Sequence, residues 1–182
     1  MSRLTLTLAL ACLASATVAN AAGWPPARAP IITGATGYID IPGAAVPPTH
    51  KHVYRAVFDA TRAAGKPADV IPALDAAGSE LNALGVAGVP MRNAKFVIVF
   101  HGGAIGALLD DAHYQARFGM ANPNLPLLQD LRRHAVELDV GGQDLAADHV
   151  EPAALTPLVR VASDALIVLV TYQNEGYALL SF

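Results

Sequence analysis

Two short runs of glycine and polar residues hold the best candidates for chemistry in this chain. They are His101-Gly102-Gly103 and Gly141-Gly142-Gln143, and each follows an apolar run typical of a buried strand. In parallel sheets, ligands collect outside the carboxyl ends of the strands. Because glycine allows unusual backbone angles and a close approach of the main chain, the N–H groups of such turns can surround an anion. The two runs therefore predict a ligand pocket at one edge of a sheet.

The polar side chains near these turns each have a chemical and a structural interpretation. His101 could donate a proton or orient a ligand, but without a thiol nearby we favour a role in fixing the turn through its ring nitrogens. Gln143, Asn122 and Gln173 could present amides to a ligand. Asn122 is equally explained as a helix cap, and Gln143 by local backbone bonding. The predicted pocket consists of His101, Gly102, Gly103, Asn122, Gly141, Gly142, Gln143 and Gln173.

Other patterns of ionisable residues are weaker. His50 and His52 have a spacing that places both rings on one face of an extended chain, but no third ligand is predictable nearby, so we expect no metal site. Asp110 and Asp111 are better explained as the start of a helix, where the macrodipole stabilises negative charge. No Ser-His-Asp or zinc-hydrolase spacing occurs, and we expect no bound cofactor.

One glycine-rich run looks like a dinucleotide-binding fingerprint but lacks the required context. Residues 33–40 would need a preceding strand, a third glycine and a following helix. Pro30 leaves room for only two strand residues, Asp40 replaces the third glycine, and Pro42 falls where the helix should run. We therefore expect no nucleotide binding there.

The first 21 residues have the pattern of an export signal. Arg3 supplies the positive charge, residues 4–18 form the apolar stretch, and Ala19-Asn20-Ala21 fits a cleavage site. The prediction is a mature chain that begins at Ala22, is periplasmic or secreted, and has no membrane association after cleavage.

Composition narrows the class of protein further. The chain has 182 residues and a net charge of −3, with no basic patch that would indicate nucleic-acid binding. Its only cysteine is Cys12, inside the predicted signal, so we expect neither a disulfide nor a thiolate-bound metal in the mature chain. Only 15% of the residues are charged, against roughly 25% in typical soluble domains. This shortage favours a homo-oligomer that buries additional surface.

Hydrophobic periodicity and helix caps predict the elements that would position the two turns. Apolar runs predict strands at residues 52–59, 95–100, 135–140 and 177–182. Caps and periodicity predict helices from Asp69 to Gly85, from Asp110 or Asp111 to near Gly119, from Asn122 onward, and between Ser163 and Gly176. The last segment is ambiguous, because residues 167–171 favour a strand by propensity, but its caps favour a helix.

This alternation of strands and helices predicts an α/β fold, a three-layer sandwich with a mainly parallel, roughly five-stranded sheet. Residues 22–50 are rich in proline, which fixes φ and removes N–H donors. We expect them to form an extended arm before one domain of residues 51–182.

The segment from about Lys51 to Phe182 resembles the DsrE/DsrF-like sulfur-relay family. The blocks that carry the resemblance are residues 96–103 (FVIVFHGG), 108–114 (LLDDAHY), 122–124 (NPN), 141–143 (GGQ) and 172–177 (YQNEGY). In that family the fourth block commonly reads Cys-Gly-Gln, and its cysteine carries sulfur as a persulfide. Here Gly141 stands at that position, and a persulfide requires a thiol. Cys-based sulfurtransferase activity is therefore not expected.

The resemblance also implies how the protein works and with what it assembles. It implies a trimer or hexamer, and as a further partner a cysteine-bearing relative. We expect an exported member that acts by binding or assembly and carries no sulfur itself. The alternative is a hydrolase or transferase that uses His101 with bound water or an unidentified cofactor.

Overall fold

The computed structural model describes residues 23–182. The predicted export signal, with Cys12, lies outside the described residues. Among residues 23–182, no helix combines the length and the apolar character needed to cross a bilayer.

The centre of the fold is a five-stranded sheet in which every neighbouring pair of strands is parallel. The strands are β1 (Tyr54–Ala60), β2 (Ala94–Phe100), β3 (Glu137–Gly141), β4 (Arg160–Ala162) and β5 (Ala178–Ser181). Their order across the sheet is β4-β3-β2-β1-β5. Parallel neighbours need crossover connections, and these place helices on the faces of the sheet.

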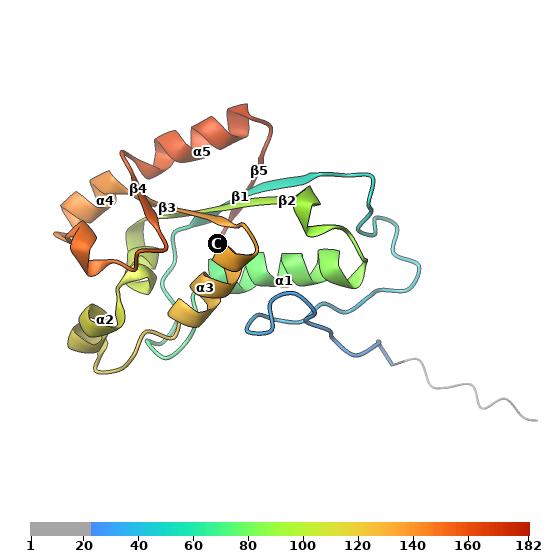
Figure 1. Ribbon diagram of the computed structural model, residues 1–182, viewed down its shortest axis with the longest axis horizontal. Coiled ribbons are helices and arrows are strands. Elements are labelled where there is room, and N and C mark those ends of the chain that lie inside the picture. Colours follow the sequence, from blue (N-terminus) through green and yellow to red (C-terminus); the bar gives the residue numbers. More distant parts are fainter. Residues whose placement is uncertain (1–22) are drawn as a thin grey trace, which may run out of the picture.

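Helices cover both faces and complete the three layers (Figure 1). One face carries α1 (Pro72–Val86) and α3 (Leu125–Arg133), and the other carries α5 (Ala165–Asn174). Beyond the carboxyl ends of the strands lie α2 (Asp111–Phe118), α4 (Gly142–Ala147) and the 3-10 helix η2 (Gly102–Leu108). The predicted α/β three-layer fold is confirmed.

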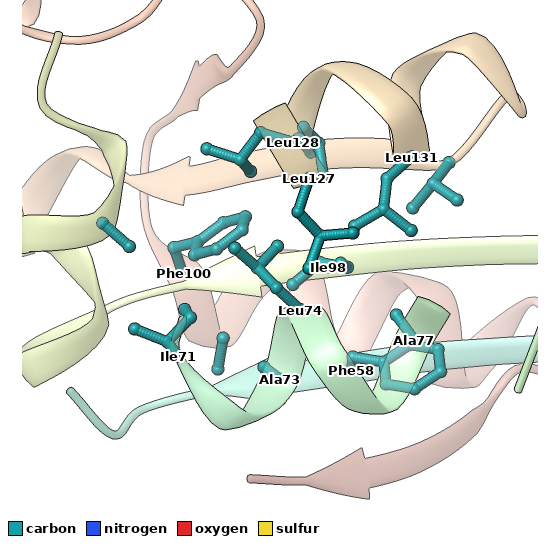
Figure 2. Packing of buried hydrophobic residues seen from close by; sticks show 14 of the residues in the cluster. Phe58, Ile71, Ala73, Leu74, Ala77, Ile98, Phe100, Leu127, Leu128 and Leu131 are labelled. Atoms are coloured by element: carbon teal, nitrogen blue, oxygen red, sulfur yellow. The ribbon is translucent and has the colours of Figure 1, made fainter. Parts of the chain in front are cut away.

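The larger core lies between the sheet and the layer of α1 and α3. Figure 2 shows strand residues packed against the two helices. Phe58, Ile98 and Phe100 come from the strands, Leu74 and Ala77 from α1, and Leu128 and Leu131 from α3. A smaller cluster on the opposite face joins Val57, Val97 and Val99 to Ala165 and Leu169 of α5. Because side chains alternate along a strand, residues next to Phe58, Phe100 and Val140 belong to the α5 face.

The predicted helix at residues 163–176 is confirmed, and its cap is corrected by one residue. The side chain of Asp164, not Ser163, accepts a hydrogen bond from the Ile167 N–H at 3.1 Å. Gly176 takes a left-handed φ of 84° just beyond the helix, as expected for a stop. The two ends outweigh the strand propensity of the β-branched residues between them.

Two other helices start later than predicted. Helix α1 begins at Pro72, so Asp69 does not cap it; the Ile71 N–H donates instead to the Asn124 side chain at 3.0 Å. Helix α3 begins at Leu125 with Asn124 as its cap residue, so Asn122 is not the cap. The stop of α1 also differs: Gly88, with φ 69°, takes the left-handed position predicted for Gly85.

The proline-rich segment packs against α1. Its Ile32 is fully buried, and Asn82 of α1 receives the N–H groups of Ile31 and Ile32 at 3.0 and 2.9 Å. The glycine-rich run at residues 33–40 lies here, where the Thr36 hydroxyl and N–H both bind Asp75 of α1. In this fold the run attaches the N-terminal segment to α1 through these hydrogen bonds.

Candidate functional site

Three neighbouring strands bring polar positions together on the α5 face. Asp59 is the penultimate residue of β1, His101 follows β2, and Gly141 ends β3. The register pairs Ala60 with Phe100 and Phe100 with Val140, so the three positions lie at the same carboxyl edge. Two of them, His101 and Gly141, belong to the predicted pocket, and Asp59 is new.

Asp59 holds the His101 ring in one orientation. His101 Nε2 lies 2.6 Å from Asp59 Oδ1, and the two side chains are 19% and 16% exposed. Because a carboxylate only accepts, Nε2 carries the proton and donates it to this bond. The other Asp59 oxygen accepts from the Ser181 hydroxyl of β5 at 3.2 Å. Among residues 23–182, no group hydrogen-bonds His101 Nδ1.

The space beside Gly141 is already filled. A Cβ atom added there would lie 2.5 Å from Asp144 Oδ2 and 2.9 Å from both the N and Cβ atoms of Ala165. The other Asp144 oxygen accepts from the Gly102 N–H at 3.3 Å. The Asp144 carboxylate of α4 therefore occupies the position that a side chain at residue 141 would take, and it also uses the backbone donor of the neighbouring turn.

The structure does not bring the remaining predicted residues to this cluster. Asn122 is buried, and its amide donates to the Ala107 and Leu109 carbonyls at 2.9 and 2.6 Å, which holds the segment before α2. Gln173 lies near the end of α5, bonded to the Leu169 carbonyl. Because α5 crosses back to the start of β5, this end of the helix lies at the opposite edge of the sheet.

The other glycines and Gln143 border the cluster. Gln143 is exposed on α4. Gly142 packs against β4, where an added Cβ would lie 2.7 Å from the Ala162 carbonyl. Gly103 faces the chain after β1, with an added Cβ 3.1 Å from the Ala63 nitrogen. Gly142 and Gly103 therefore have a packing role, because another part of the backbone comes so close that only glycine fits.

Sequence reasoning missed Asp59 and Asp144, although each has a detectable signal. Asp59 is a charged residue near the end of a mostly apolar strand, and Asp144 stands in the first turn of a helix that begins at the second glycine of a pair. Asp59 would ordinarily be interpreted as a residue at the edge of the sheet. Asp144 would ordinarily be interpreted as a negative charge that the helix macrodipole stabilises. Only the fold shows that both carboxylates approach the His101-Gly102 turn.

A second polar network was also missed, and it secures the edge strand β4. The Arg160 guanidinium binds Asp139 through two bonds of 2.7 and 2.9 Å and also reaches Glu137. The hydroxyl of Tyr172 on α5 donates to Glu137 at 3.1 Å. Burial raises the pKa of Tyr172 to about 12, so its hydroxyl remains a donor. This network joins β3, β4 and α5.

No three His, Cys, Asp or Glu side chains cluster within residues 23–182. The backbone carbonyls of His50 and His52 both accept from the Asn93 side chain, which places the pair in a turn before β1.

Comparisons with known proteins identify a family and two similar solved structures. The model of the DsrE/DsrF-like family matches residues 55–182. The structure of the protein of unknown function MTH1491 from Methanobacterium thermoautotrophicum aligns with a TM-score of 0.52 at 18% identity, over 71% of this chain and 99% of its own. The ychN protein from E. coli aligns with a TM-score of 0.46 at 16% identity, over 71% of this chain and 99% of its own. No curated protein gives a significant match.

Proposed function

Because the chain belongs to the DsrE/DsrF-like family, we propose that it is an exported, sulfur-relay-related protein that acts by binding or assembly without carrying sulfur itself. The observation that carries the proposal is the filled space at Gly141. Asp144 and the first residue of α5 occupy the volume that a thiol-bearing side chain needs. Among residues 23–182 no cysteine is present at all, and a thiolate is the nucleophile that sulfur relay requires.

The proposal predicts a mature protein that does not take up sulfur. Full-length chain would be expressed with its N-terminus intact, purified from the periplasm, incubated with polysulfide and weighed by intact mass spectrometry. We expect the mass of residues 22–182 with no added sulfur, whereas a cysteine-bearing family member treated in parallel should gain sulfur. Retention of Met1, a lipid on Cys12, or added sulfur on the mature chain would contradict the proposal.

Assembly is the second part of the proposal. Helix α5 exposes Leu166, Ile167 and Val170, at 61%, 61% and 53% of their surface, on a helix with no charged residue between Ala165 and Asn174. Contiguous exposed apolar side chains mark interaction surfaces in soluble proteins. We propose that this α5 face is buried between copies of the chain in a trimer or hexamer, with a cysteine-bearing relative as a further partner of the same face.

A hydrolase or transferase remains the alternative, and the Asp59–His101 pair is the observation that favours it. The pair presents Nδ1 of an oriented imidazole at the edge of the sheet, where it could accept a proton from bound water. Positioned general bases contribute roughly a 10²- to 10⁴-fold rate increase.

This alternative predicts hydrolysis that depends on His101. Turnover of p-nitrophenyl acetate would be followed at 400 nm for the wild type, for His101→Gln and for His149→Gln, which removes an exposed imidazole from the end of α4. If the protein is a hydrolase, the hydrolysis rate of His101→Gln should be at least tenfold lower than that of the wild type. The rate of His149→Gln should equal that of the wild type. Equal rates in both variants would eliminate the alternative.

A further inference from the structure

A cavity of about 480 Å³ lies beside the carboxyl edge of the sheet, between the loop after β1, η2 and α2. Its volume is within the range of small-molecule sites, roughly 300–1,000 Å³. The side chains of Asp59, His101 and Asp144 do not line it. It is therefore a separate space from the cluster around Gly141, although the backbone of Gly102 and Gly103 borders both.

Most of the cavity wall is apolar. Ile71 and Ile105 line it from the body of the fold, and Tyr114 and Phe118 line it from α2. Gly106 of η2 leaves part of the wall open, because an added Cβ would meet only the tip of the Phe118 ring, at 3.9 Å. Such walls suit a ligand body without charge.

Two cations line the same cavity without an acidic partner. Lys66 extends from the loop and Arg117 from α2, and neither forms an ion pair within residues 23–182. The Arg117 guanidinium lies 5.3 Å from the centroid of the Phe118 ring, which stacks the charge on an aromatic wall. Asp148 is the only acidic side chain in the lining. The lining thus has a positive balance in a chain whose net charge is −3.

Hydrogen bonds hold the loop that carries Lys66 against α2 and α3. The buried hydroxyl of Tyr114 donates to the Pro67 carbonyl at 2.7 Å, and the Asn124 side chain accepts from the Ile71 N–H at 3.0 Å. Burial raises the pKa of Tyr114, so the phenol keeps its proton and remains a donor at neutral pH. Lys66 and Arg117 therefore approach the cavity from elements that are already fixed, which reduces the entropy lost when a ligand binds.

We propose that this cavity binds a small organic anion, in which a carboxylate, sulfonate or phosphate group lies between Lys66 and Arg117 and an apolar body lies against Ile71, Ile105 and Phe118. An inorganic anion would use the cations and leave the apolar wall in water. A neutral apolar molecule would leave both cations without a partner. This binding needs no thiol and no chemistry at Gly141.

The proposal can be tested with three probes that separate charge from apolar body. Benzenesulfonate has both, benzenesulfonamide has the same body without the charge, and sulfate has the charge without the body. In calorimetric titrations of the mature protein, we expect benzenesulfonate to bind at least tenfold more tightly than either of the others. Lys66→Gln and Arg117→Gln should each weaken benzenesulfonate binding about fivefold, as loss of one near-surface charge contact predicts.

Three further variants control for non-specific charge and for cavity shape. Lys51→Gln removes an exposed cation from the opposite edge of the sheet and should leave affinity unchanged. Gly106→Leu should fill the cavity and abolish binding, and Asp148→Asn should strengthen it by removing the only negative charge in the lining. Thermal melts would establish that each variant is folded.

Several outcomes would overturn the proposal. They are no binding of benzenesulfonate at millimolar concentration, equal binding of sulfate or benzenesulfonamide, and an equal loss in Lys51→Gln and Lys66→Gln. Undiminished affinity in folded Gly106→Leu, or weaker affinity in Asp148→Asn, would also overturn it. None of these results depends on sulfur uptake, so failure here is distinguishable from failure of the proposed function.

Discussion

Replacing Gly141 by cysteine is expected to lower the free energy of unfolding by about 1–3 kcal/mol, the usual cost of forcing extra atoms into a packed site. The new Cβ would lie 2.9 Å from the backbone nitrogen of Ala165 and 2.5 Å from the Asp144 carboxylate. The Asp144 carboxylate is the end of a side chain and can shift slightly while it stays beside the new thiol, but Ala165 begins α5 and can yield only if the helix shifts. Backbone strain adds nothing, because Gly141 has an ordinary φ of −69°.

The same variant should have an unreactive thiol. A cysteine beside a helix N-terminus ordinarily has a pKa below the free value of about 8.5. Here the Asp144 carboxylate lies next to the new side chain and already holds the Gly102 N–H. A neighbouring negative charge and burial both favour the neutral thiol and raise its pKa. We expect Gly141→Cys to react with iodoacetamide at pH 7 at least tenfold more slowly than an exposed cysteine.

Removing Asp144 should reverse this behaviour. In Gly141→Cys/Asp144→Ala the negative charge and one steric contact disappear, and the Gly102 N–H becomes free to stabilise a thiolate. The alkylation rate should rise at least tenfold over the single variant. Ala146→Cys, on an exposed position of the same helix, is the matched control, and urea unfolding would verify the fold of each protein. A single variant that alkylates as fast as Ala146→Cys would show that Asp144 does not block the site.

Ile167→Glu is expected to convert the proposed oligomer into monomers at micromolar concentration. Ile167 is 61% exposed between Leu166 and Val170 on the outer face of α5. Burying an unpaired carboxylate in an interface is costly, and hot-spot changes exceed 2 kcal/mol. We therefore expect association to weaken at least a hundredfold, which corresponds to about 2.7 kcal/mol.

Light scattering and native mass spectrometry would measure the change. Val46→Glu is the matched control, because Val46 is 92% exposed in the N-terminal segment and far from α5 in the sequence. It should leave the oligomer intact. A wild-type monomer, or an Ile167→Glu protein that assembles like the control, would refute the assignment of this face.

The family and the α/β architecture could be predicted because their signals are local. Apolar runs such as residues 95–100 indicate strands covered on both faces, and caps at the two ends of α5 decided between helix and strand. Strand β4 could not be predicted in this way. It has three residues, and its attachment depends on Arg160 reaching Asp139 and Glu137 on a strand that comes more than twenty residues earlier.

The start of α1 illustrates the same limit. Asp69 has the residue type of a helix cap, yet α1 begins only at Pro72. The Ile71 N–H before it donates to the side chain of Asn124, which is the cap residue of α3. A local pattern cannot include a partner that the chain brings back after fifty residues. For the same reason Asn122, which also has the residue type of a cap, is buried under η2 instead.

By itself, the sequence determined which turns end the strands, that Gly141 carries no side chain, and that residues 23–182 contain no thiol, since each of these depends on residue identity and local spacing. Only the tertiary structure decided what surrounds those turns. It pairs His101 with Asp59 from another strand, and it places Asp144 and Ala165 where a residue-141 side chain would lie. It also sets Lys66 and Arg117 on one cavity. Distances between side chains on separate elements follow from how β1, η2, α2, α4 and α5 pack, and that packing is a property of the whole core.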